Sequence, residues 1–281
     1  MHKRLIARLD IKGPDLVKGI HLEGLRVLGS PRAFARHYYQ GGIDELIYQD
    51  IVASLYQRNS LHEFVRETAR DTFIPLTVGG GLRTIEDIRA VLRAGADKVA
   101  LNTAAVARPE LVRDASRVFG SSTIVVAIEA TRQPDGVYLA STDCGRELTS
   151  IEVVAWARQV ESLGAGEILL TSVDREGTGS GFDLDLTSRV SRAVSIPVIA
   201  HGGAGQPSHL VQVLTEGRAD AVAVASMLHY SAVRELAGAD AESATGNQEF
   251  LRRGAQHARF QGHTVARLKR ELQAQAISTR G

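Results

Sequence analysis

The two halves of this 281-residue chain repeat each other at an offset of about 120 residues. Each half opens with a short apolar run that ends in an acid, which is Asp10 in the first copy and Glu129 in the second. A glycine cluster at residues 79–81 is matched by another at residues 202–203. Solenoid repeats have periods of only about 20–50 residues, so each copy is predicted to form half of one domain. Two acids at equivalent positions of fused halves are then expected to face one shared site.

Short apolar and β-branched runs alternate with amphipathic segments along the chain. The runs predict strands at residues 5–9, 46–51, 74–78, 97–101, 123–128, 167–172, 196–200 and 220–225. The amphipathic segments predict helices at residues 31–42, 60–72, 84–94, 108–118, 150–163, 185–194 and 207–216. Apolar strands that are each followed by a helix indicate a parallel sheet covered on both faces.

This pattern predicts a single α/β domain, a (β/α)8 TIM barrel made of two fused half-barrels at about residues 1–120 and 121–230. A doubly wound sheet is the weaker alternative, because no glycine fingerprint follows the first strand. Residues 231–262 hold several glycines and little periodicity, and they are predicted to be an insertion before a final helix at 264–276. The insertion is expected to be disordered or partly helical, or to form a lid on the catalytic face.

The composition excludes several classes of protein. A net charge of +1 gives no reason to expect nucleic acid or an anionic membrane as a partner. The single cysteine, Cys144, excludes an internal disulfide and a multi-thiolate metal site, and neither a metal nor a cofactor is predicted. No apolar run reaches the roughly 18–20 residues of a membrane span, and the charged start lacks a signal peptide, so a cytoplasmic protein is expected.

Asp10 and Glu129 are the first candidates for catalysis. A carboxylate at the carboxyl end of a barrel strand lies beside bound substrate, where paired acids can divide the roles of general acid and general base. The plainer interpretation is that each acid caps a turn or pairs with a lysine such as Lys12 or Lys18. The repeated position of the two acids favours the functional interpretation.

Glycine-rich turns after the third and seventh strands form the second set of candidates. Gly81 and Gly203 lie in these turns, where backbone N–H groups can approach an anion closely. Asn102 and Thr103 follow the fourth strand, and Ser226 follows the eighth. Phosphate sites after the last two strands are common in barrels, and the repeat predicts a second site after strands three and four. Two such cradles would suit a substrate with a phosphate at each end, whereas tight turns alone are the alternative.

The loop at residues 174–183 follows the sixth strand and is rich in glycine. Thr171 lies at the end of that strand, and Gly177 lies within the loop. Both residues are predicted to contact substrate if the loop closes over the site. A plain connection is the alternative.

Charged residues mark the amino-terminal starts of four predicted strands. They are Arg4, Glu45, Lys98 and Glu167. The amino ends of barrel strands meet at the floor, opposite the active site, so these side chains are predicted to form a ring of alternating charge around the barrel axis. Salt bridges that close the floor are the usual explanation for such a ring.

Together these residues resemble the HisF family, the cyclase subunit of imidazole glycerol phosphate synthase in histidine biosynthesis. The resemblance covers residues 3–230 and resumes at 264–276. Its most specific phrases are TVGGG at 77–81, AGADKV at 94–99, GAGEILLTS at 164–172 and IAHGGAG at 199–205. The family folds as a (β/α)8 barrel of two half-barrels, which agrees with the repeat.

The resemblance implies an activity and a partner. Ammonia from a separate HisH-like glutaminase subunit, bound as a heterodimer, would enter through the barrel floor. It would attack PRFAR, a ribulosyl formimino compound with two phosphates. Cyclisation and cleavage would release imidazole glycerol phosphate and aminoimidazole carboxamide ribotide, which is the chemistry of a lyase.

The resemblance also assigns residue roles. Asp10 matches the family's first catalytic aspartate, Lys18 matches a loop lysine near the substrate, and Asp97 matches a residue that docks the glutaminase. The residues that match phosphate contacts are Gly81, Asn102, Thr103, Gly203 and Ser226. The residues that match the ammonia gate are Arg4, Glu45, Lys98 and Glu167.

Four departures from the family pattern fall in the site. Glu129 replaces the second catalytic aspartate, and its extra methylene shifts the carboxylate by roughly an ångström, which can cost on the order of 10²-fold in a tuned site. Arg8 replaces a cysteine on the strand face of Asp10, so its guanidinium is expected to pair with Glu129 or with a substrate anion. His201 replaces a serine near the second cradle, and Glu176 replaces an aspartate in the loop after the sixth strand.

Four functions stay open at this point. The first is the cyclase of histidine biosynthesis. The second is a paralogue that supports amidation or amidine formation on a nucleotide sugar in surface-glycan biosynthesis, as a retained floor and an altered site would suggest. The third is a non-catalytic scaffold that activates the glutaminase and conducts its ammonia. The fourth is a phosphoribosyl isomerase, which has no need of an ammonia gate.

Overall fold

A closed barrel of parallel strands forms the centre of the computed structural model, which describes residues 2–53, 62–236 and 262–280. The strands, in their order around the barrel, are β1 (Arg4–Lys12), β4 (Glu45–Asp50), β5 (Leu76–Gly79), β6 (Lys98–Leu101), β7 (Ile124–Arg132), β10 (Glu167–Ser172), β11 (Val198–His201) and β12 (Ala221–Val224). Parallel pairing of β12 with β1 closes the ring. The predicted (β/α)8 barrel is therefore confirmed.

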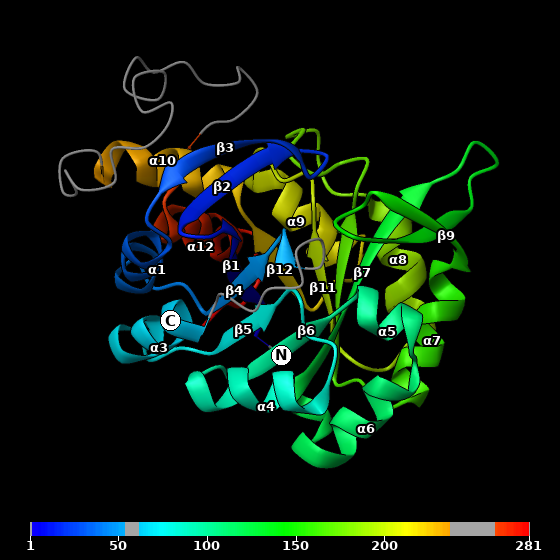
Figure 1. Cartoon of the computed structure of the whole chain (residues 1–281). Coiled ribbons are helices and arrows are strands. Elements are labelled where there is room, and N and C mark those ends of the chain that lie inside the picture. Colours follow the sequence, from blue (N-terminus) through cyan, green and yellow to red (C-terminus); the bar gives the residue numbers. More distant parts are fainter. Residues whose placement is uncertain (1, 54–61, 237–261, 281) are drawn as a thin grey trace.

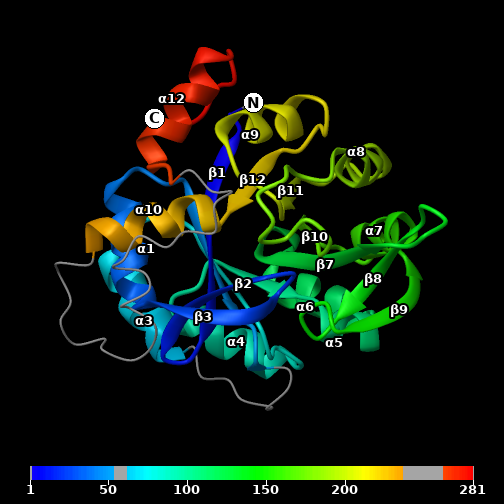
Figure 2. The same cartoon turned by 90° about the horizontal axis from the view of Figure 1, so that it is seen from above.

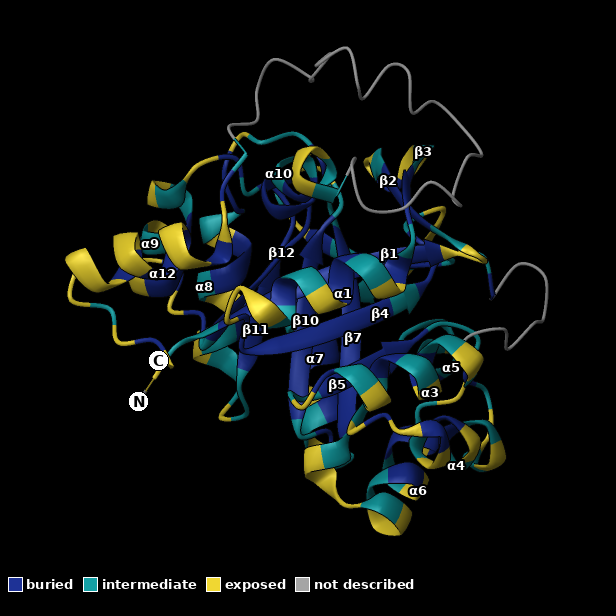
Figure 3. Ribbon diagram, turned by 90° about the vertical axis from the view of Figure 1, so that its left-hand side faces the viewer, coloured by how far each residue is buried: buried dark blue, intermediate teal, exposed yellow. Residues whose placement is uncertain are grey.

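Helices surround these strands (Figure 1). They are α1 (Pro31–Gln40), α3 (His62–Asp71), α4 (Ile85–Ala94), α5 (Thr103–Ala107), α6 (Glu110–Phe119), α7 (Val153–Ser162), α8 (Leu184–Ala193), α9 (Pro207–Thr215), α10 (Ser226–Leu236) and α12 (Val265–Ala274). Local capping defines several starts. At α4, for example, Thr84 accepts a hydrogen bond from the N–H of Asp87, whose side chain accepts one in return. The outer helix faces are exposed and the barrel strands are buried (Figure 3).

Two antiparallel hairpins were not predicted from the sequence. They are β2 (Asp15–Ile20) with β3 (Glu23–Gly29), and β8 (Tyr138–Thr142) with β9 (Glu147–Glu152). Each hairpin extends the first barrel strand of its half, because β2 pairs with β1 and β8 pairs with β7. The prediction of a helix over 150–163 was wrong at its start, because β9 runs to Glu152 and the helix begins at Val153.

The barrel interior is layered. Alternate residues of a strand face the same side, so β1 directs Arg4, Ile6, Arg8 and Asp10 inward. An apolar layer fills the middle, formed by Ile6, Ile47, Ala100, Val125, Ala127, Leu169, Ile199, Ala221 and Ala223. Charged side chains lie below this layer at the floor and above it at the carboxyl ends of the strands.

The C-terminal part returns to the start of the chain. Thr279 forms a bridge with Lys3, and Lys269 of α12 donates to Asp44 at 2.7 Å. The described ends of the chain therefore lie on the same side of the barrel, the upper side in Figure 2. The insertion predicted at 231–262 begins within α10, and residues 237–261 lie outside the described part. Among the described helices, none is both long and apolar enough to cross a membrane.

Candidate active site

Asp10 and Glu129 both lie at the carboxyl ends of barrel strands, on β1 and β7. Their exposed fractions are 3% and 6%. Glu129 accepts a hydrogen bond of 2.8 Å from the backbone N–H of Gly145, which lies in the turn between β8 and β9. The negative charge of Asp10 contributes to raising the pKa of Glu129.

Arg8 pairs with Asp10. Its Nε lies 2.9 Å from Asp10 Oδ1, on the same face of β1. The prediction that Arg8 would pair with Glu129 was wrong, because Asp10 lies only two residues away on the same strand face and takes that place. A contact of Arg8 with a substrate anion stays a prediction. Lys18 is the lysine that the plainer interpretation had placed beside Asp10, and its Nζ lies 3.8 Å from Asp10 Oδ2.

The two acids differ in protonation. Burial acts to raise the pKa of Asp10, but the Arg8 guanidinium and the Lys18 ammonium outweigh it and hold that pKa below its ordinary value. Burial raises the pKa of Glu129 to about 7, against the opposing effects of Arg8 and of the Gly145 N–H. Near neutral pH, Asp10 is therefore a carboxylate, while Glu129 is poised to hold or release a proton. Acids with separated pKa values can divide the work of acid–base catalysis.

The raised pKa of Glu129 predicts a pH-dependent stability difference. The buried carboxyl favours its neutral form, so its contribution to folding is fully present below the ordinary pKa of 4.5 and is lost as the pH rises through about 7. We expect Glu129→Gln to be more stable than the parent protein at pH 8, by on the order of 3 kcal/mol, and to match it near pH 4.5. Urea unfolding at several pH values measures the difference. A difference that does not change with pH would contradict the raised pKa.

The first predicted cradle lines a cavity of about 190 Å³ that also borders Arg8 and Glu129. Gly81, Asn102 and Thr103 all contribute to its wall. The β8–β9 hairpin covers this cradle: Asn102 Nδ2 donates to the Ser141 carbonyl at 3.2 Å, and Thr103 Oγ1 accepts from the N–H of Asp143 at 3.1 Å. Thr103 also begins α5, so this helix start faces the cavity.

The second predicted cradle lies on the opposite half. Gly177, Gly203 and Ser226 line one hollow, together with Lys18 and His201. Gly203 has a φ of 103°, and a Cβ there would collide with the carbonyl of Gly181, so only glycine fits this close approach. Ser226 is the first residue of α10. The hollow therefore combines a glycine turn with a helix start, which is a common arrangement for binding anions.

Lys18 and Glu176 join the two sides of the site. Lys18 lies on β2 and forms an ion pair with Glu176, and both side chains are buried. The other carboxylate oxygen of Glu176 accepts from the N–H of Leu22 at 3.0 Å. The N–H of His21 donates to the Glu176 carbonyl at 3.0 Å. The loop at 174–183 is thus attached to the β2–β3 hairpin in this structure, and its mobility stays a prediction.

The two hairpins cross between the halves. The β2–β3 hairpin belongs to the first half and contacts Glu176 of the second. The β8–β9 hairpin belongs to the second half and contacts Thr103 of the first, while Cys144 at its turn donates to the Ile51 carbonyl at 3.2 Å. Each hairpin therefore covers the half-barrel from which it does not come.

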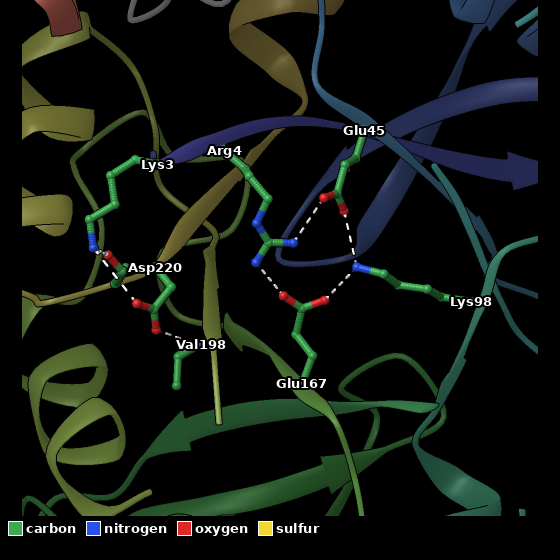
Figure 4. A network of polar contacts seen from close by, with 8 residues as sticks. Lys3, Arg4, Glu45, Lys98, Glu167, Val198 and Asp220 are labelled. Carbon is green, nitrogen blue, oxygen red and sulfur yellow. Dashed lines mark hydrogen bonds and ion pairs between the residues drawn. The ribbon is translucent and has the colours of Figure 1, made fainter. Parts of the chain in front are cut away.

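The four charged floor residues form a closed ring (Figure 4). Arg4 binds Glu45 at 3.0 Å and also binds Glu167, while Lys98 lies 3.3 Å from Glu45 and 3.0 Å from Glu167. Burial acts to lower the pKa of Arg4, but the two glutamates outweigh it and raise that pKa above its ordinary value. The structure brings these residues together as a charge-balanced ring at the opposite end of the barrel from Asp10.

Asp97 lies at the same end but outside the ring. Its side chain is exposed, and Oδ2 accepts from the N–H of Leu76 at 2.9 Å. Asp44 and Asp220 make the same contact with the N–H groups of Leu5 and Val198. In each case an aspartate just before one strand accepts a hydrogen bond from the backbone at the start of the preceding barrel strand. Asp97 therefore has a structural role, whether or not it also docks a partner.

Sequence reasoning missed two contributors to the site. Asp50 is the last residue of β4, whereas Asp10 and Glu129 lie two and three residues before the ends of their strands, and Asp50 lines the first cavity with Gln49. An acid at a strand end was the available signal. Gly145 could not be found in this way, because its contact with Glu129 depends on the unpredicted hairpin. No cluster of side chains suited to a metal ion occurs among the described residues.

The chain is similar to proteins of known function. Residues 4–234 match the family described as "Histidine biosynthesis protein". A relative from Legionella pneumophila, "Imidazole glycerol phosphate synthase subunit HisF", is 60% identical over 203 residues, covering 72% of this chain and 96% of its own length. Two proteins of the same name are each 48% identical. The one from Alkaliphilus metalliredigens matches 82% of this chain and 92% of its own length, and the one from Methanopyrus kandleri matches 81% and 90%.

Proposed function

Since this chain belongs to the HisF family, the cyclase subunits of imidazole glycerol phosphate synthase, we propose that Asp10 and Glu129 are the acid–base pair of its cyclase reaction. The observation that carries this assignment is the unequal environment of the two acids. Asp10 is held as a carboxylate by Arg8 and Lys18, whereas Glu129 has a pKa of about 7. The relatives bear the name of this synthase subunit, so they do not favour the sugar-amidating paralogue, the scaffold or the isomerase.

The proposed substrate is PRFAR, with one phosphate in each cradle. Gly81, Asn102 and Thr103 would hold one end, and Gly203 and Ser226 would hold the other. The reacting centre would then lie between the cradles, near both acids. Asp10, as the carboxylate, is suited to accept a proton from the attacking nitrogen. Glu129, when protonated, is suited to supply a proton to the departing group.

The ammonia would come from a HisH-like glutaminase bound at the floor. The charge-balanced ring of Arg4, Glu45, Lys98 and Glu167 supports this part of the proposal, because it lies at the floor, next to the apolar layer of the barrel interior. Uncharged ammonia can cross an apolar layer at lower cost than ammonium, which would have to lose its hydration. Asp97, exposed beside the ring, would contribute to the docking face.

Turnover of PRFAR with an ammonium salt tests the proposal without any partner. We expect the purified protein to consume PRFAR, measured as loss of substrate absorbance, and Lys12→Ala, a change at an exposed position, to behave like the parent. A natively folded protein that does not turn over would contradict the assigned reaction. If Arg8→Cys with Glu129→Asp then gained activity, the site would be one adapted to another acceptor. Stimulation of a glutaminase without turnover would identify a scaffold.

A further inference from the structure

The second cradle contains a side chain that the first cradle lacks. His201 ends β11, opposite Thr171 of β10. In the first half, Gly79 ends β5 opposite Gln49 of β4, at an offset of 201 − 79 = 122 residues. A Cβ at Gly79 would meet the end of the Gln49 side chain, so a side chain there would have to displace Gln49, and the first half carries none. The imidazole of His201 is therefore one difference between the two cradles.

The contacts of His201 fix the place of its proton. Nδ1 lies 3.1 Å from Arg8 Nη1 and 3.2 Å from Thr171 Oγ1. A guanidinium can donate a hydrogen bond but cannot accept one, so Nδ1 must be the acceptor. A second cation beside Arg8 would be repelled in this buried place. Burial first, and then the charges of Arg8 and Lys18, hold the pKa of His201 well below its ordinary value. A neutral imidazole that accepts at Nδ1 carries its proton on Nε2.

Because Nδ1 is bound to Arg8 and Thr171, Nε2 is the ring nitrogen left to serve the second cradle. His201 lines the hollow that Gly202, Gly203 and Ser226 also form. Within the described part of the chain, Nε2 has no hydrogen-bond partner, whereas Nδ1 has two. This N–H donor has a fixed direction and no partner among the described residues. It borders a glycine turn and the start of the 11-residue helix α10, so it is suited to bind an oxyanion.

We propose that Arg8 fixes His201 as the Nε2–H tautomer and that this N–H is an additional donor to a phosphoryl oxygen in the second cradle. The inference rests on the proposed function, which makes that cradle a phosphate site. It also assigns a use to the asymmetry between the halves. A substrate with two phosphates meets one cradle with a directional imidazole donor and one without, so the pair of cradles favours one orientation of the substrate. Arg8 acts here as a positioning residue, through His201.

Nitrogen NMR of protein labelled with ¹⁵N-histidine tests the tautomer directly and needs no turnover. His201→Phe, which keeps a planar ring but has no donor, identifies the signals of His201. We expect an unprotonated Nδ1 and a protonated Nε2. The opposite tautomer, or an imidazolium, would overturn the inference. In Arg8→Met we expect the signal to change toward a mixture of tautomers, because the obligatory donor is gone.

Titration with inorganic phosphate tests the ligand. We expect the Nε2–H signal to shift on phosphate binding in the parent protein and equally in Thr103→Ala, which alters only the first cradle. His201→Phe should bind phosphate in the second cradle about tenfold more weakly, and His201→Asn, which keeps a donor, should recover part of the affinity. A signal that does not respond to phosphate would contradict the role of His201 even if PRFAR is turned over. A response without turnover would instead count against the proposed reaction alone.

Discussion

Asp10→Asn is expected to lower kcat for ammonia-dependent turnover of PRFAR by about 10³-fold, because the amide cannot accept a proton. The same change should also destabilise the fold. Arg8 is 2% exposed, and the carboxylate of Asp10 is its only ion-pair partner in the described residues. An unpaired buried charge costs about 3 kcal/mol or more, so we expect a loss of this size in the free energy of unfolding. Stopped assays and urea unfolding measure the two effects.

A second substitution separates catalysis from stability. In the double variant Arg8→Met with Asp10→Asn, the unpaired guanidinium is gone, so most of the lost stability should return. Turnover should stay low, since the carboxylate is still absent. If the double variant regained turnover along with stability, Asp10 would be a structural partner of Arg8 and the assignment of the acid–base pair would be wrong. An Asp10→Asn variant that keeps more than about a tenth of the parent activity would contradict it as well.

Glu167→Gln should separate the two sources of ammonia. The change keeps the size of the side chain but leaves Arg4 and Lys98 with one carboxylate between them, so the ring gains a net positive charge. With a HisH-like glutaminase as partner, we expect glutamine-dependent turnover of PRFAR to fall about tenfold relative to turnover with added ammonium. The ratio of the two rates is the measurement, because loss of folded protein lowers both rates together.

The neighbouring pair of Lys3 and Asp220 supplies a matched control. It lies on the same face, outside the ring, with a separation of 3.7 Å and with 27% and 37% of the two side chains exposed (Figure 4). Exposed pairs of this kind contribute about 0–1 kcal/mol, and the hydrogen bond of 2.6 Å from Lys3 Nζ to the Ala219 carbonyl adds a similar amount, so Lys3→Ala should lower stability by no more than about 2 kcal/mol and leave the ratio of rates unchanged. Equal loss of both rates in Glu167→Gln would show that the ring closes the floor but does not pass ammonia.

The barrel could be predicted because its strands are apolar on both faces and stand between amphipathic helices. The hairpins could not be predicted, and their turns give the reason. His21 and Leu22 in one turn, and Asp143 and Cys144 in the other, adopt positive φ angles without being glycine. Hairpins are usually recognised by Asn-Gly or similar pairs at such positions. The strands themselves are short and partly exposed, so they lack the apolar runs that identified the barrel strands.

The part of the site that lies at strand ends could be predicted along with the barrel. Strand ends give the positions of Asp10, Glu129 and the floor ring, because a closed barrel fixes which strand ends meet. The partner of Arg8 could not be chosen from the sequence. Asp10 and Glu129 both end up close enough for a long side chain to reach, and the sequence alone does not show how the barrel interior packs. Only the packed structure distinguishes them, with Arg8 bonded to Asp10 and with His201 on the other side of its guanidinium.

The crossed hairpins have a consequence for how the two halves of the chain depend on each other. A duplicated half-barrel could in principle keep each copy self-sufficient, with its own anion cradle and its own cover. Here the cover of each cradle is borrowed from the other copy, through Glu176 on one side and Thr103 on the other. Loss of one half, or mutations in its hairpin, would therefore expose the cradle of the other half to solvent. Each half of the chain thus needs the hairpin of the other half to complete its anion site.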